Sequence, residues 1–116
     1  MKNFIAYQVA LQVTRQLAGC LGVIKRQDRD LERQLRRAMQ STVLNLAEGN
    51  RRQGKDRVHL FSIAAGSAAE VQACLDVAAA WGYISADRAA PVRRQLDRVL
   101  GMLHRLMGNS AVLKRA

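Results

Sequence analysis

Apolar residues recur every three or four positions through four long stretches of this chain, and short polar breaks separate the stretches. That spacing is the period of an α-helix with one apolar face. It is clearest near the C-terminal end, where the inward stripe consists of Val92, Leu96, Val99, Leu100, Leu103 and Leu106, and the outward line consists of Arg94, Arg98 and Arg105. The pattern predicts four helices, over residues 3–24, 29–49, 55–82 and 88–107.

Short connections between helices favour antiparallel neighbours. We therefore predict an all-α fold, an antiparallel up-down-up-down four-helix bundle over residues 1–109, followed by a frayed basic tail over 110–116. Hydrophobic residues make up 49% of the chain but aromatic residues only 4%, so the core must consist mainly of Ala, Leu and Val.

Residues that favour helix ends stand near the predicted boundaries. Asp28 or Asp30 can cap the second helix. Gly49 is a residue type that ends a helix in a left-handed cap, as is Asn50. Pro91 fits the first turn of a helix, which leaves the exact start of the last helix open.

The third predicted helix is the least polar. Of the 25 residues from 58 to 82, 17 are hydrophobic, well above the about three in seven that cover one core. We expect this helix to lie at the centre of the fold and to present a second apolar face to another subunit. Leu44 and Ala47 on the outer side of the second helix add to the surplus, so we predict a homo-oligomer.

The first helix is long enough to cross a bilayer, at ~33 Å for residues 3–24, and its only charge is Arg15. One face carries Gln8, Gln12, Arg15 and Gly19, and the other carries Phe4, Tyr7, Leu11, Ala18 and Leu21. This amphipathic pattern is typical of a bundle helix, so we predict no membrane association. Cys20 and Cys74 lie in apolar stretches as small hydrophobes, and with no convincing secretory signal we expect a reducing cytoplasm.

The formal net charge of +10 favours an acidic partner, above all nucleic acid. An up-down-up-down topology gathers many of the cations at one end, where only Asp56 opposes them, while charges nearly balance at the other end. The predicted nucleic-acid-binding residues are Lys2, Arg51, Arg52, Lys55, Arg57, Arg94, Arg98 and Arg105. Two alternatives stay open: a solvated basic rim, and a protein–protein interaction module or scaffold whose basic surface docks an acidic protein.

Polar residues border the apolar arc of the second helix, where they need partners. A partner stripe stands on the third helix. We predict a structural polar network near the seam between these helices, formed by Arg37, Ser41, Asn45, Glu48, Ser67 and Glu70.

The same region resembles a known bacterial family. The residues concerned are Gln34-Leu35-Arg36-Arg37-Ala38, Asn45-Leu46-Ala47-Glu48-Gly49 and Gly66-Ser67 with Glu70. They resemble the four-helix-bundle family called 23S ribosomal RNA intervening-sequence proteins, which includes accessory variability determinants of diversity-generating retroelements. Many relatives carry a proline where this chain reads Thr42-Val43-Leu44, so the second helix should run unbroken.

The resemblance implies partners as well as a fold. Similar proteins form ring-shaped pentamers, and the retroelement members assist a reverse transcriptase on its RNA template. It therefore adds a pentamer, and a reverse transcriptase or another protein, to the expected partners.

The residues do not favour catalysis or a metal. A di-iron bundle needs Glu-x-x-His pairs, but Glu48 is followed three residues later by Arg51, and Glu70 by Ala73. No glycine-rich phosphate loop follows a strand. We predict no catalytic residues, no metal site and no cofactor.

Overall fold

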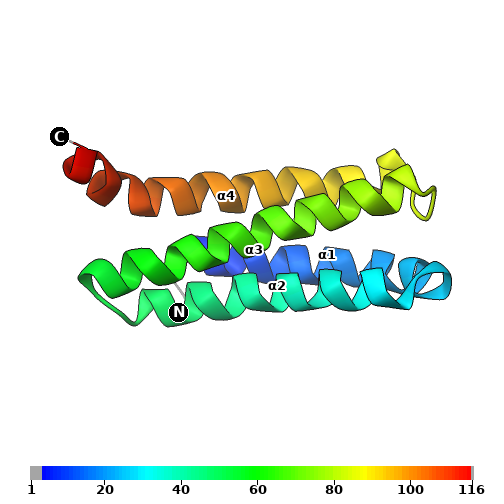
Figure 1. Cartoon of the computed structure of the whole chain (residues 1–116), viewed down its shortest axis with the longest axis horizontal. Coiled ribbons are helices and arrows are strands. Elements are labelled where there is room, and N and C mark those ends of the chain that lie inside the picture. The colour runs from blue at the N-terminus through cyan, green and yellow to red at the C-terminus, as the bar shows by residue number, and fades with distance from the viewer. Residues whose placement is uncertain (1–3, 116) are drawn as a thin grey trace.

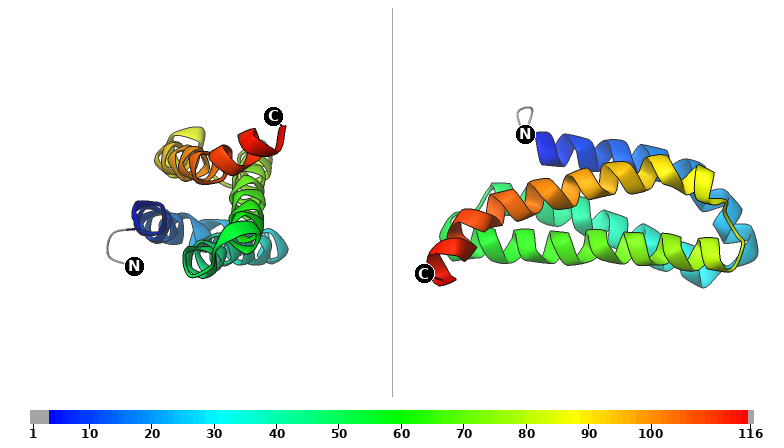
Figure 2. Two further views of the ribbon diagram at one scale, coloured as in Figure 1. Left: turned by 90° about the vertical axis from the view of Figure 1, so that its left-hand side faces the viewer. Right: turned by 90° about the horizontal axis from the view of Figure 1, so that it is seen from above.

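A computed structural model describes residues 4–115, with side chains for residues 4–108, and over this part four helices run alternately up and down one long axis (Figure 1). They are α1 (Ile5–Gln27), α2 (Arg29–Asn50), α3 (Gly54–Ala80) and α4 (Ala86–Arg115). Each helix packs against the next and α1 also packs against α4, so the four enclose one core, as the end-on view shows (Figure 2). The predicted all-α, up-down-up-down four-helix bundle is confirmed.

Helix boundaries differ from the predicted ones where capping groups set them. α1 continues past residue 24 to Gln27, because Lys25 and Arg26 are exposed in its last turn, where cations favour a helix C-terminus. α4 begins two residues before 88, next to Ser85, whose hydroxyl accepts a hydrogen bond from the Arg88 backbone N–H at 3.2 Å. The helix continues to Arg115 through the segment predicted as a frayed tail, and the side chains from 109 onward lie outside the described part.

Pro91 lies in the second turn of α4, one turn later than the sequence suggested. The proline removes the hydrogen bond to the carbonyl four residues earlier, which belongs to Asp87. Since Asp87 is exposed, water can bond that carbonyl, and the helix tolerates the proline.

The core consists mainly of Ala, Val and Leu, with two isoleucines, two cysteines, Met39 and one buried phenylalanine, Phe61. On α4 the predicted inward stripe is buried at Val92, Leu96, Val99 and Leu103, but Leu106 is 38% exposed. On α1 the buried side chains are Ala6, Val9, Ala10, Val13, Leu17, Cys20 and Ile24. The face predicted for α1 is thus wrong, and its Ala18 is exposed.

Asp28 ends α1 and caps α2, as predicted. Its Oδ1 accepts a hydrogen bond from the Leu31 backbone N–H at 3.0 Å, and its Oδ2 accepts one from the Tyr83 hydroxyl at 3.4 Å. The carboxylate therefore joins the turn between α1 and α2 to the turn between α3 and α4.

Replacing this cap should weaken the fold. We expect Asp28→Ala to lower the free energy of unfolding by about 1 kcal/mol, because a backbone N–H at the start of α2 loses its acceptor. Urea denaturation at one fixed protein concentration measures the change. Asp30→Ala is the matched control, since Asp30 is exposed in the same turn, and equal losses in the two variants would contradict the capping role.

Gly49 allows α2 and α3 to approach closely. It is buried within α2, and a Cβ atom built on it would lie 2.7 Å from ring atoms Cδ1 and Cε1 of Phe61. The predicted left-handed cap at Gly49 or Asn50 is wrong: among the described residues only Gly54 and Gly82 have positive φ. Glycine is required at position 49 by space, whereas Gly54, at φ 60°, eases the turn into α3.

The outward face of α3 is exposed and mostly apolar, although the exposed carboxylate Glu70 lies between Ile63 and Val77 at seven-residue spacing. It carries Ile63 and Val77, with the small residues Gly66, Ala69, Ala73 and Ala80 beside them. By length and composition alone α3 could cross a membrane, and 33% of its most apolar window is buried in the bundle. One side of α3 thus faces the core while the other leaves an unpartnered apolar surface, here called the α3 outer face.

Candidate functional site

Four cations surround the turn between α2 and α3: Arg51, Arg52, Lys55 and Arg57. We call this group the basic turn. The first three side chains are exposed, and Asp56 is the one acidic residue within 51–57. The turn lies at the end of the bundle to which α4 returns (Figure 1). Phosphate groups could approach these cations without rearrangement of the fold.

Two of these arginines are held by neighbours. The guanidinium of Arg57 lies over the Phe61 ring at 5.0 Å from its centroid, and Arg57 Nη1 donates to the Asn50 carbonyl at 3.4 Å. Arg52 Nε forms an ion pair with Glu48 Oε2 at 3.2 Å. That pair is half exposed, so it contributes little to stability and leaves Arg52 able to exchange its partner.

The predicted arginines of α4 do not all join the basic turn. Arg105 is exposed ten residues before the end of α4 and lines an apolar hollow of about 430 Å³ with Phe4, Ile5, Ala6, Met102 and Leu106. Arg94 and Arg98 are exposed earlier in α4, and so lie farther from the end of the helix at Arg115. Lys2 lies outside the described residues. The structure therefore groups the four cations of the basic turn and leaves Arg94, Arg98 and Arg105 spread along α4.

Charges are mixed at the other end of the bundle. Five cations, Lys25, Arg26, Arg29, Arg33 and Arg88, stand near four carboxylates, Asp28, Asp30, Glu32 and Asp87. Arg88 Nη2 also donates to the Gly19 carbonyl at 2.7 Å. The net positive charge at this end is therefore small compared with that of the basic turn.

The predicted polar network is only partly formed. Ser41 Oγ and Ser67 Oγ lie 2.7 Å apart between α2 and α3, and Asn45 Nδ2 donates to the Ser41 carbonyl at 2.8 Å and to Ser41 Oγ at 3.2 Å. Glu48 instead pairs with Arg52, because that arginine follows one helical turn later. The network at the seam thus consists of Ser41, Asn45 and Ser67.

Arg37 and Glu70 are exposed and line a polar hollow of about 390 Å³ between α2 and α3. Asp30, Arg33 and Gln34 complete its lining. Among the described side chains no ion pair joins Arg37 to Glu70, so this part of the predicted network is absent.

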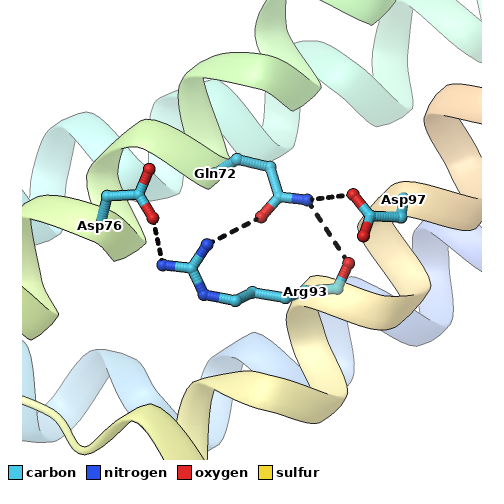
Figure 3. Close-up of polar contacts among 4 residues, drawn as sticks. All are labelled: Gln72, Asp76, Arg93 and Asp97. Atoms are coloured by element: carbon cyan, nitrogen blue, oxygen red, sulfur yellow. Dashed lines mark hydrogen bonds and ion pairs between the residues drawn. The ribbon is translucent and has the colours of Figure 1, made fainter.

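A second polar cluster, which sequence reasoning missed, joins α3 to α4 (Figure 3). Gln72 Nε2 donates to Asp97 Oδ1 at 2.8 Å, Arg93 Nη1 donates to Gln72 Oε1 at 3.5 Å, and Arg93 also pairs with Asp76. Residues 72 and 76, like 93 and 97, stand four apart on one helix face, and this complementary spacing was the available signal. The cluster holds α3 against α4 next to the exposed Arg94 and Arg98.

The remaining reactive side chains are inert or isolated. Burial raises the pKa of Cys74, and burial raises the pKa of Cys20 although the nearby Arg88 charge opposes it, so both remain thiols near neutral pH. Glu48 and Glu70 lie in separate surroundings, and within the described residues no three potential metal ligands gather. What the surface offers chemically is a set of accessible cations.

Comparisons with known proteins agree with this fold. The sequence model of the family described as 23S rRNA-intervening sequence protein matches residues 2–105. A crystal structure of a protein of unknown function from the S23 ribosomal protein family of Bacteroides thetaiotaomicron VPI-5482 is similar, with a TM-score of 0.78 and 15% sequence identity over 88% of this chain and 97% of that one. At such identity the likeness shows a shared fold. No curated protein matches the chain.

Proposed function

Because the chain belongs to the 23S rRNA-intervening sequence protein family, and no catalytic family is indicated for it, we propose a non-enzymatic bundle that self-associates and binds nucleic acid through the basic turn. The observation that supports this proposal is the exposure of Arg51, Arg52 and Lys55 together at one end of a chain with a formal charge of +10. The cytoplasm, which holds abundant RNA and DNA, is the expected compartment.

The contact should be made with phosphate groups. Arginine and lysine donate to phosphate oxygens without reading the sequence, and each neutralised phosphate releases a counterion. Arg57 is held over Phe61 by a cation–π contact, which restricts its side chain. Binding should therefore depend weakly on sequence and strongly on salt.

Neutralising the basic turn tests the proposal. We expect the triple variant Arg51→Gln, Arg52→Gln, Lys55→Gln to bind a labelled single-stranded RNA more weakly, and to lower the slope of log affinity against log salt by about 2, because about 0.7 counterion is released per phosphate on single strands. Fluorescence anisotropy across a salt series measures both quantities.

A charge-matched control separates the site from the total charge. The triple variant Arg15→Gln, Arg33→Gln, Arg37→Gln removes the same charge from exposed positions outside the basic turn. It should keep most of the affinity and slope. Equal losses in the two triple variants would show that the basic turn is not the binding site.

Self-association is supported by unpartnered apolar surface. The α3 outer face is exposed over several turns, and its small residues permit close approach of another helix. Leu44 on α2 is 66% exposed beside a second apolar hollow, of about 290 Å³, which is lined by Leu11, Thr14, Gln40, Val43 and Leu44. Two separate apolar surfaces favour assembly with further copies of the chain, and the resemblance described above suggests a pentamer.

The second candidate is a protein-interaction module that uses the same basic surface to dock an acidic protein. A gel shift with unrelated RNA and DNA at two salt concentrations separates the candidates. A nucleic-acid-binding bundle retains both polymers at low salt and releases them at high salt. Failure to retain either polymer at low salt would favour the interaction module.

A narrower role as an accessory factor of a reverse transcriptase depends on genomic context. A reverse transcriptase gene beside this one would favour that role, and a position inside a ribosomal RNA insertion would argue against it.

A further inference from the structure

Two aromatic side chains stack in the turn between α3 and α4, at the end of the bundle opposite the basic turn. The ring centroids of Trp81 and Tyr83 are 6.5 Å apart, and the planes meet at 20°. Gly82 between them takes a positive φ of 79°, which reverses the chain and brings the two rings together. Trp81 is 70% exposed, so most of its surface contacts water.

Tyr83 supports the pair from beneath. It is half-buried, and its hydroxyl donates to Asp28 Oδ2 at 3.4 Å, which fixes the ring against the turn between α1 and α2. Loss of hydration and the adjacent Asp28 carboxylate raise the pKa of Tyr83, so the hydroxyl keeps its proton. Trp81 therefore stacks on a neighbour that is already ordered, so binding a ligand requires little further ordering of the pair.

Cations flank Asp28, the residue that accepts the hydrogen bond from Tyr83. Lys25 and Arg26 precede Asp28, and Arg29 follows it. All three are exposed, and none of them forms an ion pair in the described part of the chain. An unpaired nucleotide presents a flat base and a phosphate. The exposed aromatic face can stack on the base, and exposed cations without ion pairs can bind the phosphate.

We propose that Trp81, supported by Tyr83, is a stacking platform for an unpaired base of single-stranded nucleic acid, with the flanking phosphates on Lys25, Arg26 and Arg29. The inference rests on the proposed function and adds a second contact at the far end of the bundle. A base inside a duplex hides both its faces, so this site selects single strands. RNA and DNA share the base face, and the experiment compares them.

The surroundings of Trp81 favour a base over a second copy of the chain. The α3 outer face ends at Ala80, and the next residue, Trp81, stacks on Tyr83, whose hydroxyl donates to Asp28 in the turn between α1 and α2. An anchor in a protein interface is normally surrounded by groups that exclude water. Around this pair the neighbours in the two turns are small, polar or charged, namely Gly82, Ser85, Asp28 and the exposed cations that flank Asp28, and such hydrated surroundings suit a charged strand.

The length of α3 sets the length of strand that reaches both sites. Its 27 residues span about 40 Å, which corresponds to about 12 nucleotides at about 3.4 Å each. A strand of that length can contact the basic turn and the aromatic pair together. A strand of four nucleotides can contact only one of them.

The chain contains a single tryptophan, so its fluorescence reports on this site alone. We expect 12-nucleotide oligouridine and oligothymidine to quench the emission of the intact protein at the concentrations at which anisotropy records binding, and a duplex of the same length to bind without quenching. Trp81→Leu should weaken binding of the single strands by about ten-fold and leave duplex binding unchanged. Trp81→Phe, which keeps an aromatic face, should recover most of the affinity.

The results that would contradict a stacking role for Trp81 are as clear as the expected ones. If single strands bind without quenching, or bind Trp81→Leu as tightly as the unaltered protein, Trp81 does not stack on a base. The basic turn would then remain as the proposed binding site. An emission shift on dilution without nucleic acid would assign Trp81 to contact between copies. If neither polymer binds at low salt, the proposed function fails and the platform fails with it.

Discussion

Gly49→Ala is expected to lower the free energy of unfolding by about 1–3 kcal/mol, although alanine is the better helix former. A Cβ at position 49 would meet the Phe61 ring at 2.7 Å, and Phe61 is fully buried with its ring 6.0 Å from that of Phe4. The ring cannot swing away into solvent, so α2 and α3 must separate or the ring must leave its rotamer. Urea denaturation measures the loss.

Gly22→Ala is expected to raise the free energy of unfolding, in contrast to Gly49→Ala. Gly22 is exposed within α1, and apart from its chain neighbours and the adjoining backbone of α1, no described heavy atom lies within 4 Å of the position that a Cβ would occupy there. Its replacement should stabilise the bundle by about 0.5–1 kcal/mol, through the lower entropy of the unfolded chain. If Gly49→Ala stabilised the protein as Gly22→Ala does, close packing of Phe61 on Gly49 would be disproved.

Charge placed on the α3 outer face should convert an assembled protein into monomers. The double variant Ala73→Glu, Val77→Glu puts two carboxylates on a surface where Val77 is 43% exposed in the single chain. Burying such groups without partners costs several kcal/mol, which exceeds what a modest interface can supply. Light scattering gives the mass, and circular dichroism checks that the helices remain.

The same change of charge elsewhere serves as the control. Gln27→Glu with His104→Glu alters exposed positions on α1 and α4, and this variant should keep the mass of the unaltered protein. A monomeric mass for the unaltered protein at micromolar concentration would refute the self-association proposal directly.

The sequence predicted the helices better than their faces. Apolar periodicity located all four helices, and the capping preference of aspartate placed the start of α2 at Asp28 or Asp30, of which Asp28 forms the cap. The buried face of α1 is not set by its sequence alone. Its polar residues occupy a narrow arc, so either edge of the wide apolar arc can face the core. Packing against α2 and α4 decides between them, and Ala18 is exposed while Leu17 is buried.

Within the candidate site, the sequence predicts groups of residues that are close in the chain, but not contacts between helices. The basic turn follows from four cations within seven residues. Glu48 was predicted in the network between α2 and α3, whereas it pairs with Arg52 on its own helix; this choice depends on how α2 crosses α3. The crossing of α2 and α3 also explains Gly49. Its residue type suggested a helix end, but it is the position where the Phe61 ring packs against α2.

The even number of antiparallel helices has a practical consequence for handling this protein. The chain leaves α4 at the end of the bundle where it entered α1, and the turn between α2 and α3 lies at that end too (Figure 1). An affinity tag or fluorescent label joined to either terminus is therefore tethered close to Arg51 and Arg52. A label placed near Gly82 would instead stand about 40 Å away, at the other end of α3. Binding measurements with tagged protein should be repeated after the tag is cleaved.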